Sequence, residues 1–263
     1  MNILLGLVCI IFGFIIGSFL NVVIYRLNTK KSLGGRSMCL SCSSTLHWYD
    51  LVPVFSYFLL LGRCRSCKSK ISFQYPLVEL GTGILFGLLF FKLNFLLELD
   101  TFFFAVNYIY YAALISFLMV ITVYDIKHKI IPDSMSFVFG LLAFLGIFFI
   151  DSGLVFFHWP VLDQLVSGFA LSLPFAFLWL VSRGRWMGLG DAKLAVGLGF
   201  MLGLTKLVPA TLIAFWAGAL YGIILIALGK AGPKSEIPFA PFLVLGTLVA
   251  FLFDLSIANL IFW

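Results

Sequence analysis

The stretch MGLGDAKL, residues 187 to 194, places an ionisable carboxylate, Asp191, behind two glycines at the start of a long apolar segment. A charged side chain at membrane depth costs roughly 3 kcal/mol on insertion scales, so an Asp in such a place indicates a function. Gly188 and Gly190 give the neighbouring backbone conformational freedom, and irregular backbone at that depth persists only where it lines a cavity or is buried in protein. The stretch therefore predicts a site in the membrane, in which Asp191 needs a partner.

The composition is that of a polytopic membrane protein. Of the 263 residues, 62% are hydrophobic and only 11% are charged, and the mean hydropathy is +1.14. These values lie outside the range of soluble globular chains. Residues 1–25 form an apolar run that is too long and continuous for a signal-peptide core and lacks a cleavage pattern, so we expect a retained first span. The predicted fold class is an all-α polytopic membrane protein.

Hydropathy over windows of about 20 residues predicts eight membrane spans. They lie near residues 2–25, 77–92, 102–124, 134–150, 162–182, 192–205, 207–228 and 241–262. The sixth is short for a span. Glycines four residues apart, as at Gly83 and Gly87 or Gly199 and Gly203, are compatible with helices that approach closely in lipid.

The basic residues test this topology independently, because Lys and Arg concentrate in loops on the cytosolic side. Every basic residue except Lys92 and Lys206 falls in loops that the eight-span topology puts on one side of the membrane. The largest group of them lies within residues 26–74. We therefore expect both termini outside and residues 26–74 in the cytosol. The net charge of +6 arises mostly from this bias and gives little support to nucleic-acid binding.

Residues 26–76 are predicted to form a small soluble domain held by a metal ion. Cys39 and Cys42 form one CxxC pair and Cys64 and Cys67 another, with 21 residues between the pairs. Four thiolates at such spacing predict a closed, structural zinc site. Disulfides and unpaired thiols are the alternatives, and a cytosolic location disfavours disulfides. His47 is a less favoured substitute ligand, and Cys9, inside the first span, is interpreted as a small buried hydrophobic residue.

Asp125 is the predicted partner of Asp191. It stands at the cytosolic end of the third span, in YDIKHKIIPD (residues 124–133), and the topology puts it at the same membrane face as Asp191. Two carboxylates that are close together in a low-dielectric site do not both ionise easily, so one holds a proton while the other acts as a base. An aspartic protease needs such a pair.

The residues alone leave other interpretations open. Asp125 and Asp191 are also explained as helix caps or loop charges, and Asp133, after Pro132, is mainly a cap. Glu79, near the start of the second span, should face the bundle interior and pair with a cation, such as a loop Lys or Arg. A transporter lined by acidic residues would need more carboxylates near mid-span, where Asp254 is the only other candidate. A zinc-bearing scaffold would tolerate loss of both aspartates.

The chain resembles the bacterial type IV prepilin peptidases, which belong to the GxGD class of intramembrane aspartic proteases. The similarity runs through GSFLNVVIYRL (17–27), the paired-CxxC segment ending in YPLVE (39–79), YDIKHKIIPD, MGLGDAKL and IPFAPFLVLG (237–246). The motifs occur in this order over nearly the whole chain, which makes the match specific.

This resemblance implies a peptidase that removes the basic leader of type IV prepilins or pseudopilins at the cytosolic face of the bacterial plasma membrane. It also implies methylation of the new N-terminal amine with S-adenosylmethionine. The catalytic pair would be Asp125 and Asp191, with Gly188, Gly190 and Lys193 in the active-site loop. The metal ligands would be the four paired cysteines, and Glu79 would belong to the amine or methyl-transfer site. The membrane peptidase domain would be residues 77–263.

Some positions depart from the family pattern. The first CxxC lacks a frequent proline, and Lys127 stands where many members have a second Asp. Arg183, Arg185 and Trp186 precede Met187 where an acidic residue is common. No glycine-rich nucleotide loop follows a strand, so methylation is implied by the resemblance alone. The client protein and the oligomeric state are not determined by the sequence.

Overall fold

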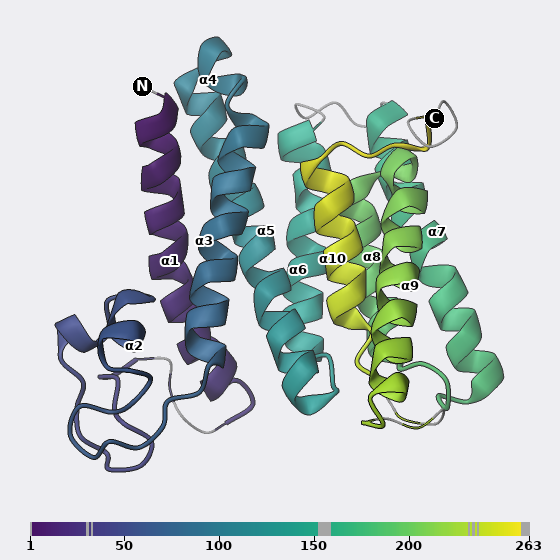
Figure 1. Cartoon of the computed structure of the whole chain (residues 1–263). Coiled ribbons are helices and arrows are strands. Elements are labelled where there is room, and N and C mark those ends of the chain that lie inside the picture. Colours follow the sequence, from purple (N-terminus) through teal and green to yellow (C-terminus); the bar gives the residue numbers. More distant parts are fainter. Residues whose placement is uncertain are drawn as a thin grey trace. The chain divides into compact units, whose positions relative to one another are not determined.

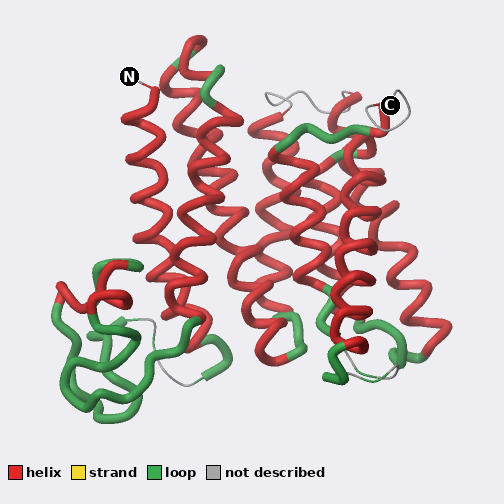
Figure 2. The backbone as a smooth tube through the Cα atoms, viewed as in Figure 1, coloured by secondary structure: helices red, strands yellow, loops and turns green. Residues whose placement is uncertain are grey.

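The computed structural model describes residues 2–29, 32, 34–151, 159–230, 232, 235 and 237–258. Helices make up almost all of the regular structure in these residues, which contain no strand beyond two isolated bridges (Figure 2). The predicted all-α class is confirmed. The chain divides into one unit of residues 1–120 and a second of residues 121–263, each of which is considered by itself.

In the first unit, the helix of the first predicted span packs against the helix of the second. Its helices are α1 (Asn2–Arg26), a 3-10 turn (Trp48–Asp50), α2 (Phe55–Leu59), α3 (Gln74–Leu93), α4 (Leu96–Leu99) and most of α5 (Thr101–His128). α1 lies along α3, and the segment between them forms a small domain with little regular structure (Figure 1). Apolar side chains such as Leu7 and Ile11 remain exposed on α1, as expected for a surface that contacts lipid.

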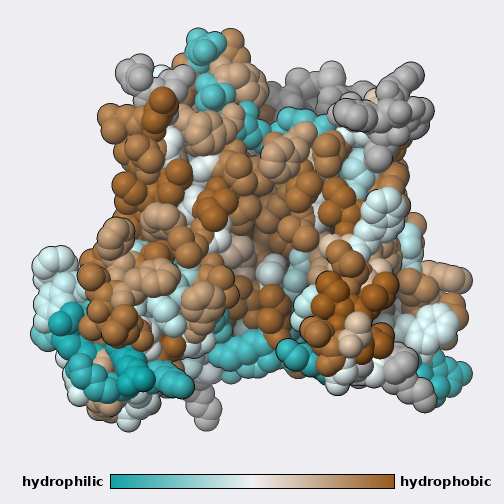
Figure 3. Space-filling view, viewed as in Figure 1, coloured by the Kyte–Doolittle hydropathy of each residue, from teal (hydrophilic) through white to brown (hydrophobic). Residues whose placement is uncertain are grey.

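The second unit is a helical bundle built around α8. It contains the last turns of α5, then α6 (Asp133–Gly146) with a π-helical extension (Ile147–Asp151), α7 (Trp159–Ser182), α8 (Leu189–Leu202), α9 (Leu204–Ala227) and α10 (Ala240–Leu252). α8 contacts α6, α7, α9 and α10, and most of its side chains are buried. Apolar side chains cover the visible sides of the helices, whereas polar ones gather at the helix ends (Figure 3).

The helices follow the predicted spans, with differences at their ends. In the described part of the chain, six helices are long and apolar enough to cross a membrane, whereas α8 and α10 are shorter. The predicted continuous span over residues 241–262 is wrong at its centre, because α10 ends at Leu252 and a turn follows; residues 259–262 lie outside the described part of the chain. In this turn Asp254 has a φ of 50° and forms an ion pair with Lys206 at 2.6 Å. Asp254 is thus an exposed charge at a helix end, where water stabilises it.

Glycines mark the places where helices approach most closely. A Cβ atom added at Gly83 would overlap the ring of Phe14, which shows that α1 and α3 need a glycine there. A Cβ atom at Gly199 would lie 2.5 Å from the Cα atom of Gly168, so α7 and α8 touch backbone to backbone. Gly203 has a different role. It is the only residue between α8 and α9, and its φ of 71° turns the chain out of the first helix and into the second.

Candidate active site and metal site

Asp125 and Asp191 lie together inside the second unit. Asp125 is in the last turn of α5 and is 4% exposed, and Asp191 is in the first turn of α8 and is 8% exposed. They are close enough for the charge on Asp125 to act on the carboxyl group of Asp191. Both carboxylates are thus buried in the second unit, at the end of α5 and at the start of α8, although 66 positions separate them in the sequence.

Backbone N–H groups hold the two carboxylates in place. The N–H of Ala240, at the start of α10, donates to Asp125, and the N–H of Gly188 donates to Asp191. The first N–H groups of a helix lack partners within the helix and carry partial positive charge, so they stabilise an acidic side chain. Asp125 Oδ2 has no hydrogen-bond partner.

The two glycines before Asp191 differ from the expectation. Gly188 is the extended N-cap residue of α8, whereas Gly190 is already helical, and neither has a positive φ. The prediction of a loosened backbone is therefore wrong at Gly190. A Cβ atom there would lie 3.0 Å from the Cβ of Ile131, so this glycine allows the chain before α6 to pack against the start of α8.

Lys193 forms its ion pair with Asp133 and not with Asp191, which is two residues before it in the sequence. Its Nζ atom lies 2.8 Å from Asp133 Oδ1, and both side chains are substantially exposed. Exposed pairs of this kind contribute at most about 1 kcal/mol. Asp133 is the first residue of α6, which agrees with its interpretation as a helix-end residue. The pair links α6 to α8 at the end of the bundle that carries the two buried aspartates.

The four paired cysteines converge in the first unit. Their Sγ atoms all lie within 4.8 Å of one another, and Cys39 Sγ is 3.8 Å from Cys67 Sγ. A tetrahedral ion with metal–sulfur bonds of about 2.3 Å would space its ligand atoms at about 3.8 Å. This group could therefore hold a metal ion, as the spacing predicted. The hydroxyl of Ser44 lies 3.0 Å from Cys42 Sγ, and that of Ser69 lies 3.1 Å from Cys67 Sγ.

The two CxxC pairs have the same local construction. The residue after each second cysteine, Ser43 or Lys68, has a positive φ and donates its N–H to the carbonyl of the first cysteine. Backbone N–H groups of Cys42 and Ser41 also donate to the Cys39 thiol and lower its pKa to about 6, despite some desolvation. A thiol with this pKa is largely a thiolate at neutral pH, which is the form that binds metal.

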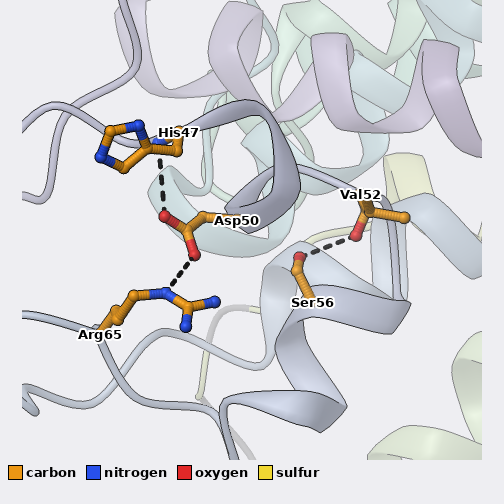
Figure 4. Close-up of polar contacts among 5 residues, drawn as sticks. All are labelled: His47, Asp50, Val52, Ser56 and Arg65. Carbon is orange, nitrogen blue, oxygen red and sulfur yellow. Dashed lines mark hydrogen bonds and ion pairs between the residues drawn. The ribbon is translucent and has the colours of Figure 1, made fainter.

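His47 takes no part in the cysteine group. Its ring stacks on Tyr49, and its backbone N–H donates to Asp50 Oδ2 at 3.3 Å. The other Asp50 oxygen accepts a hydrogen bond from Arg65 Nε at 2.8 Å (Figure 4). Asp50 thus connects the turn before α2 to the second CxxC pair. Its side chain is 5% exposed, so this bond is less accessible to solvent than most surface ion pairs.

Comparison with known proteins places these sites in one family. The Bacterial Peptidase A24 N-terminal domain matches residues 11–93, and the Type IV leader peptidase family matches residues 112–223. A prepilin leader peptidase/N-methyltransferase of Bacillus subtilis is 34% identical over 250 residues, which cover 95% of this chain and 94% of that protein. The chain belongs to the type IV leader peptidase family.

Other curated relatives carry the same description. The Myxococcus xanthus protein is 35% identical over 228 residues, and the chain spans only 65% of its length. The Neisseria gonorrhoeae protein is 29% identical over 281 residues and is covered to 92%. No solved structure gives a significant match. The paired aspartates and the paired cysteines thus belong to a leader peptidase with two matched regions.

In this leader peptidase, Glu79 accepts hydrogen bonds, and among the described residues it has no ion pair with a loop Lys or Arg; Lys30 and Lys31 lie outside these residues. Its Oε2 atom accepts the N–H of Val54 at 2.6 Å, and Ser18 also donates to its carboxylate. Val54 is the centre of a γ-turn with a φ of 64°, closed by the N–H of Phe55 and the carbonyl of Pro53 at 2.6 Å. Such turns are rare and strained, most of all at a β-branched residue.

Asn21 is a buried polar residue that the sequence interpretation missed. It lies in α1, is 2% exposed, and donates its amide N–H to the carbonyl of Tyr75 at 3.1 Å. Its Oδ1 atom has no partner. A polar residue within an otherwise apolar first span is the signal that would have identified it.

Proposed function

We propose that this chain is a bacterial prepilin leader peptidase that cleaves the leader from type IV prepilins or pseudopilins with Asp125 and Asp191 as its catalytic pair. The observation that carries the assignment is the meeting of these two buried carboxylates at the end of one bundle, in a member of the leader peptidase family. The relatives' shared description as N-methyltransferases supports a second activity, methylation of the new N-terminal amine.

The geometry supports acid–base hydrolysis. One carboxylate takes a proton from a water molecule, whose oxygen bonds to the scissile carbonyl carbon, while the other, protonated carboxyl gives its proton to the carbonyl oxygen. When the carbon–nitrogen bond breaks, the first carboxyl gives its proton to the leaving amine. A hydroxyl of the tetrahedral intermediate returns a proton to the second carboxylate as the new carboxyl group forms, so the pair is back in its starting state. The unpartnered Asp125 Oδ2 atom is the natural position for water or the carbonyl. The Ala240 and Gly188 N–H groups keep both carboxylates oriented.

The charge pattern supports a cytosolic position for this chemistry. Lys127 and Lys129 flank the end of α5, and Lys193 stands near the start of α8, so basic residues surround the membrane face that bears the pair. By the positive-inside rule this is the cytosolic face of the plasma membrane. A basic leader would stay in the cytosol while the apolar pilin helix remains in the bilayer. Gly188, Gly190 and Lys193 would then shape the loop that receives the scissile bond.

Two bound groups complete the proposal. Cys39, Cys42, Cys64 and Cys67 would hold a structural Zn²⁺ ion, which suits four thiolates with no position left for water. S-adenosylmethionine would supply the methyl group. We further propose a division into a first span (1–25), the zinc-binding domain (26–76) and a membrane peptidase domain (77–263), in which Glu79 belongs to the methyl-transfer site.

The decisive experiment replaces each aspartate with its neutral isostere. Coexpressed with a prepilin, Asp125→Asn and Asp191→Asn should each reduce leader removal at least a hundredfold, since acid–base groups typically contribute a factor of about 10²–10⁴. Asp133→Asn is the matched control, because this acid is exposed at the start of α6 and, among the described residues, its ion pair is with Lys193. Normal cleavage by either well-expressed dyad variant would refute the assignment.

A further inference from the structure

The outward face of α2, in the cysteine-bearing domain, is entirely apolar. Its side chains are Phe55, Phe58 and Leu59, which are 71%, 57% and 80% exposed and lie on one side of the helix because they are three and four residues apart. The opposite face is turned inward, where Ser56 and Tyr57 line a cavity of about 870 Å³. A helix at the surface of a soluble domain presents polar side chains to water, so the pattern of α2 is reversed.

Leu61 extends this apolar face in an unusual backbone conformation. It follows the end of α2 with a φ of 51°, and its side chain is 85% exposed. The N–H of Gly62 donates to the carbonyl of Tyr57 at 2.8 Å, which closes a helix-terminal motif whose left-handed residue is usually glycine. A leucine in this conformation is strained, and a side chain so exposed gains little from the folded chain itself. An apolar environment outside the chain would supply the missing contacts.

Two contacts fix α2 beside the membrane-spanning helix α3. The N–H of Val54, directly before α2, donates to Glu79 of α3 at 2.6 Å, and the ring centroids of Tyr57 and Phe73 lie 6.1 Å apart. Glu79 is five residues after Gln74, the first residue of α3, which corresponds to about 7.5 Å along the helix. The 20 residues of α3 span about 30 Å, the thickness of the hydrocarbon core. The start of α2 therefore lies at the depth of the membrane interface.

The apolar face adjoins the lipid-facing surface of α1. In Figure 1, α2 lies on the side of the cysteine-bearing domain next to the lower part of α1. Exposed apolar side chains on α1 continue along the helix to Ile15 and Phe19, at 54% and 52% exposure. Figure 3 shows apolar side chains on the upper part of the domain, whereas hydrophilic side chains gather on its lower part. The domain thus turns its apolar side toward the depth at which α1 contacts lipid.

Basic residues accompany the apolar face. Arg63, Arg65 and Lys68 lie in and around the second CxxC pair, directly after α2, and all three are exposed. The only acid within residues 32–73 is Asp50, whose side chain is 5% exposed and paired with Arg65. The accessible charge of this segment is therefore positive, and positive side chains near a membrane are attracted to anionic lipids.

We propose that the outward face of α2, together with Leu61 and Trp48, inserts into the headgroup region of the bilayer and anchors the cysteine-bearing domain to the membrane surface. Trp48 is 79% exposed in the turn that contacts α2, and tryptophan is enriched at membrane interfaces. Anionic phospholipids fit this surface, with acyl chains against the apolar side chains and phosphates against the basic ones. A protein partner fits less well, because the face belongs to a helix of five residues that adjoins lipid.

Photocrosslinking identifies what contacts the face. Leu59→benzoylphenylalanine is introduced into the full chain, in vesicles of phosphatidylethanolamine and phosphatidylglycerol, with Leu40→benzoylphenylalanine as the matched control. Leu40 is also an exposed leucine of this domain, at 62%, but it lies in the turn of the first CxxC pair. Because irregular backbone is excluded from lipid, mass spectrometry should find roughly tenfold more lipid adducts at position 59 than at position 40. Equal lipid adducts at both positions, or adducts of position 59 with a second protein chain in place of lipid, would overturn the anchor.

Leu61→Gly separates anchoring from folding. Glycine adopts the φ of 51° without strain, so the domain should keep its metal content and Tm while it loses an apolar contact with the membrane. In vesicles whose outer side carries the domain, trypsin should cleave after Arg63 severalfold faster in Leu61→Gly and in Phe58→Ser/Leu59→Ser than in the wild type or in Leu40→Ser. Wild-type cleavage should also accelerate when phosphatidylcholine replaces phosphatidylglycerol. Wild-type cleavage rates in both α2-face variants would refute the proposal.

Discussion

The contact between α7 and α8 gives a quantitative prediction for Gly199→Ala. The added Cβ atom would lie 2.5 Å from both the Cα of Gly168 and the carbonyl oxygen of Ser167, whereas carbon atoms in contact are normally about 3.5–4.0 Å apart. The two helices must therefore separate by about 1 Å. Both obstacles are backbone atoms, so no side-chain rotation relieves the overlap.

The expected cost follows from three terms. Overpacking of this size costs about 1–3 kcal/mol. Separation also weakens the 2.7 Å bond from Ser167 Oγ to the Gly199 carbonyl, and such bonds between membrane helices average about 0.6 kcal/mol. Replacement of a helical glycine by alanine returns about 0.5–1 kcal/mol. The net destabilisation of Gly199→Ala should be roughly 1–3 kcal/mol.

Gly140→Ala is the matched control, because a Cβ atom there has no neighbour within 4 Å. It should be neutral or stabilising by up to about 1 kcal/mol. Reversible unfolding of both variants in mixed micelles measures the difference directly. Prepilin cleavage should also fall in Gly199→Ala, because α8 carries Asp191 about 12 Å away along the helix. If Gly199→Ala were as stable as Gly140→Ala, the close helix contact would be refuted.

Two further predictions concern the active site and the metal. Gly190→Ala should slow cleavage, because the added Cβ atom would press on Ile131, next to the residue that precedes Asp191. A second substitution, Ile131→Ala, should restore part of the rate. No recovery in the double variant would contradict the explanation by steric overlap. The purified chain should contain about one zinc ion, as measured by plasma emission spectrometry. Cys42→Ser and Cys64→Ser should each lose this ion, whereas the control Cys9→Ser should keep it. A metal-free chain with its fold intact would contradict a structural role for zinc.

The sequence determined the helices, because hydropathy and the distribution of Lys and Arg record how each segment partitions between lipid and water. The four-cysteine group could also be predicted, since two CxxC pairs at this spacing are typical of a metal site. The sequence also predicted Asp125 as the partner of Asp191, and both side chains are buried in the second unit. Alternating topology requires the end of α5 and the start of α8 to lie at one membrane face.

Only the tertiary structure decided which side chains and backbones meet. Lys193 pairs with Asp133, Gly190 makes room for Ile131, and Asn21 lines a cavity with an unpartnered oxygen. These features depend on helix rotation, on packing at the scale of single atoms, and on the path of a strained turn at Val54. Hydropathy depends on the composition of a segment and is insensitive to such rotations. The sequence by itself therefore determined the helices and the cysteine group and predicted the acid pair, whereas packing decided the contacts around them.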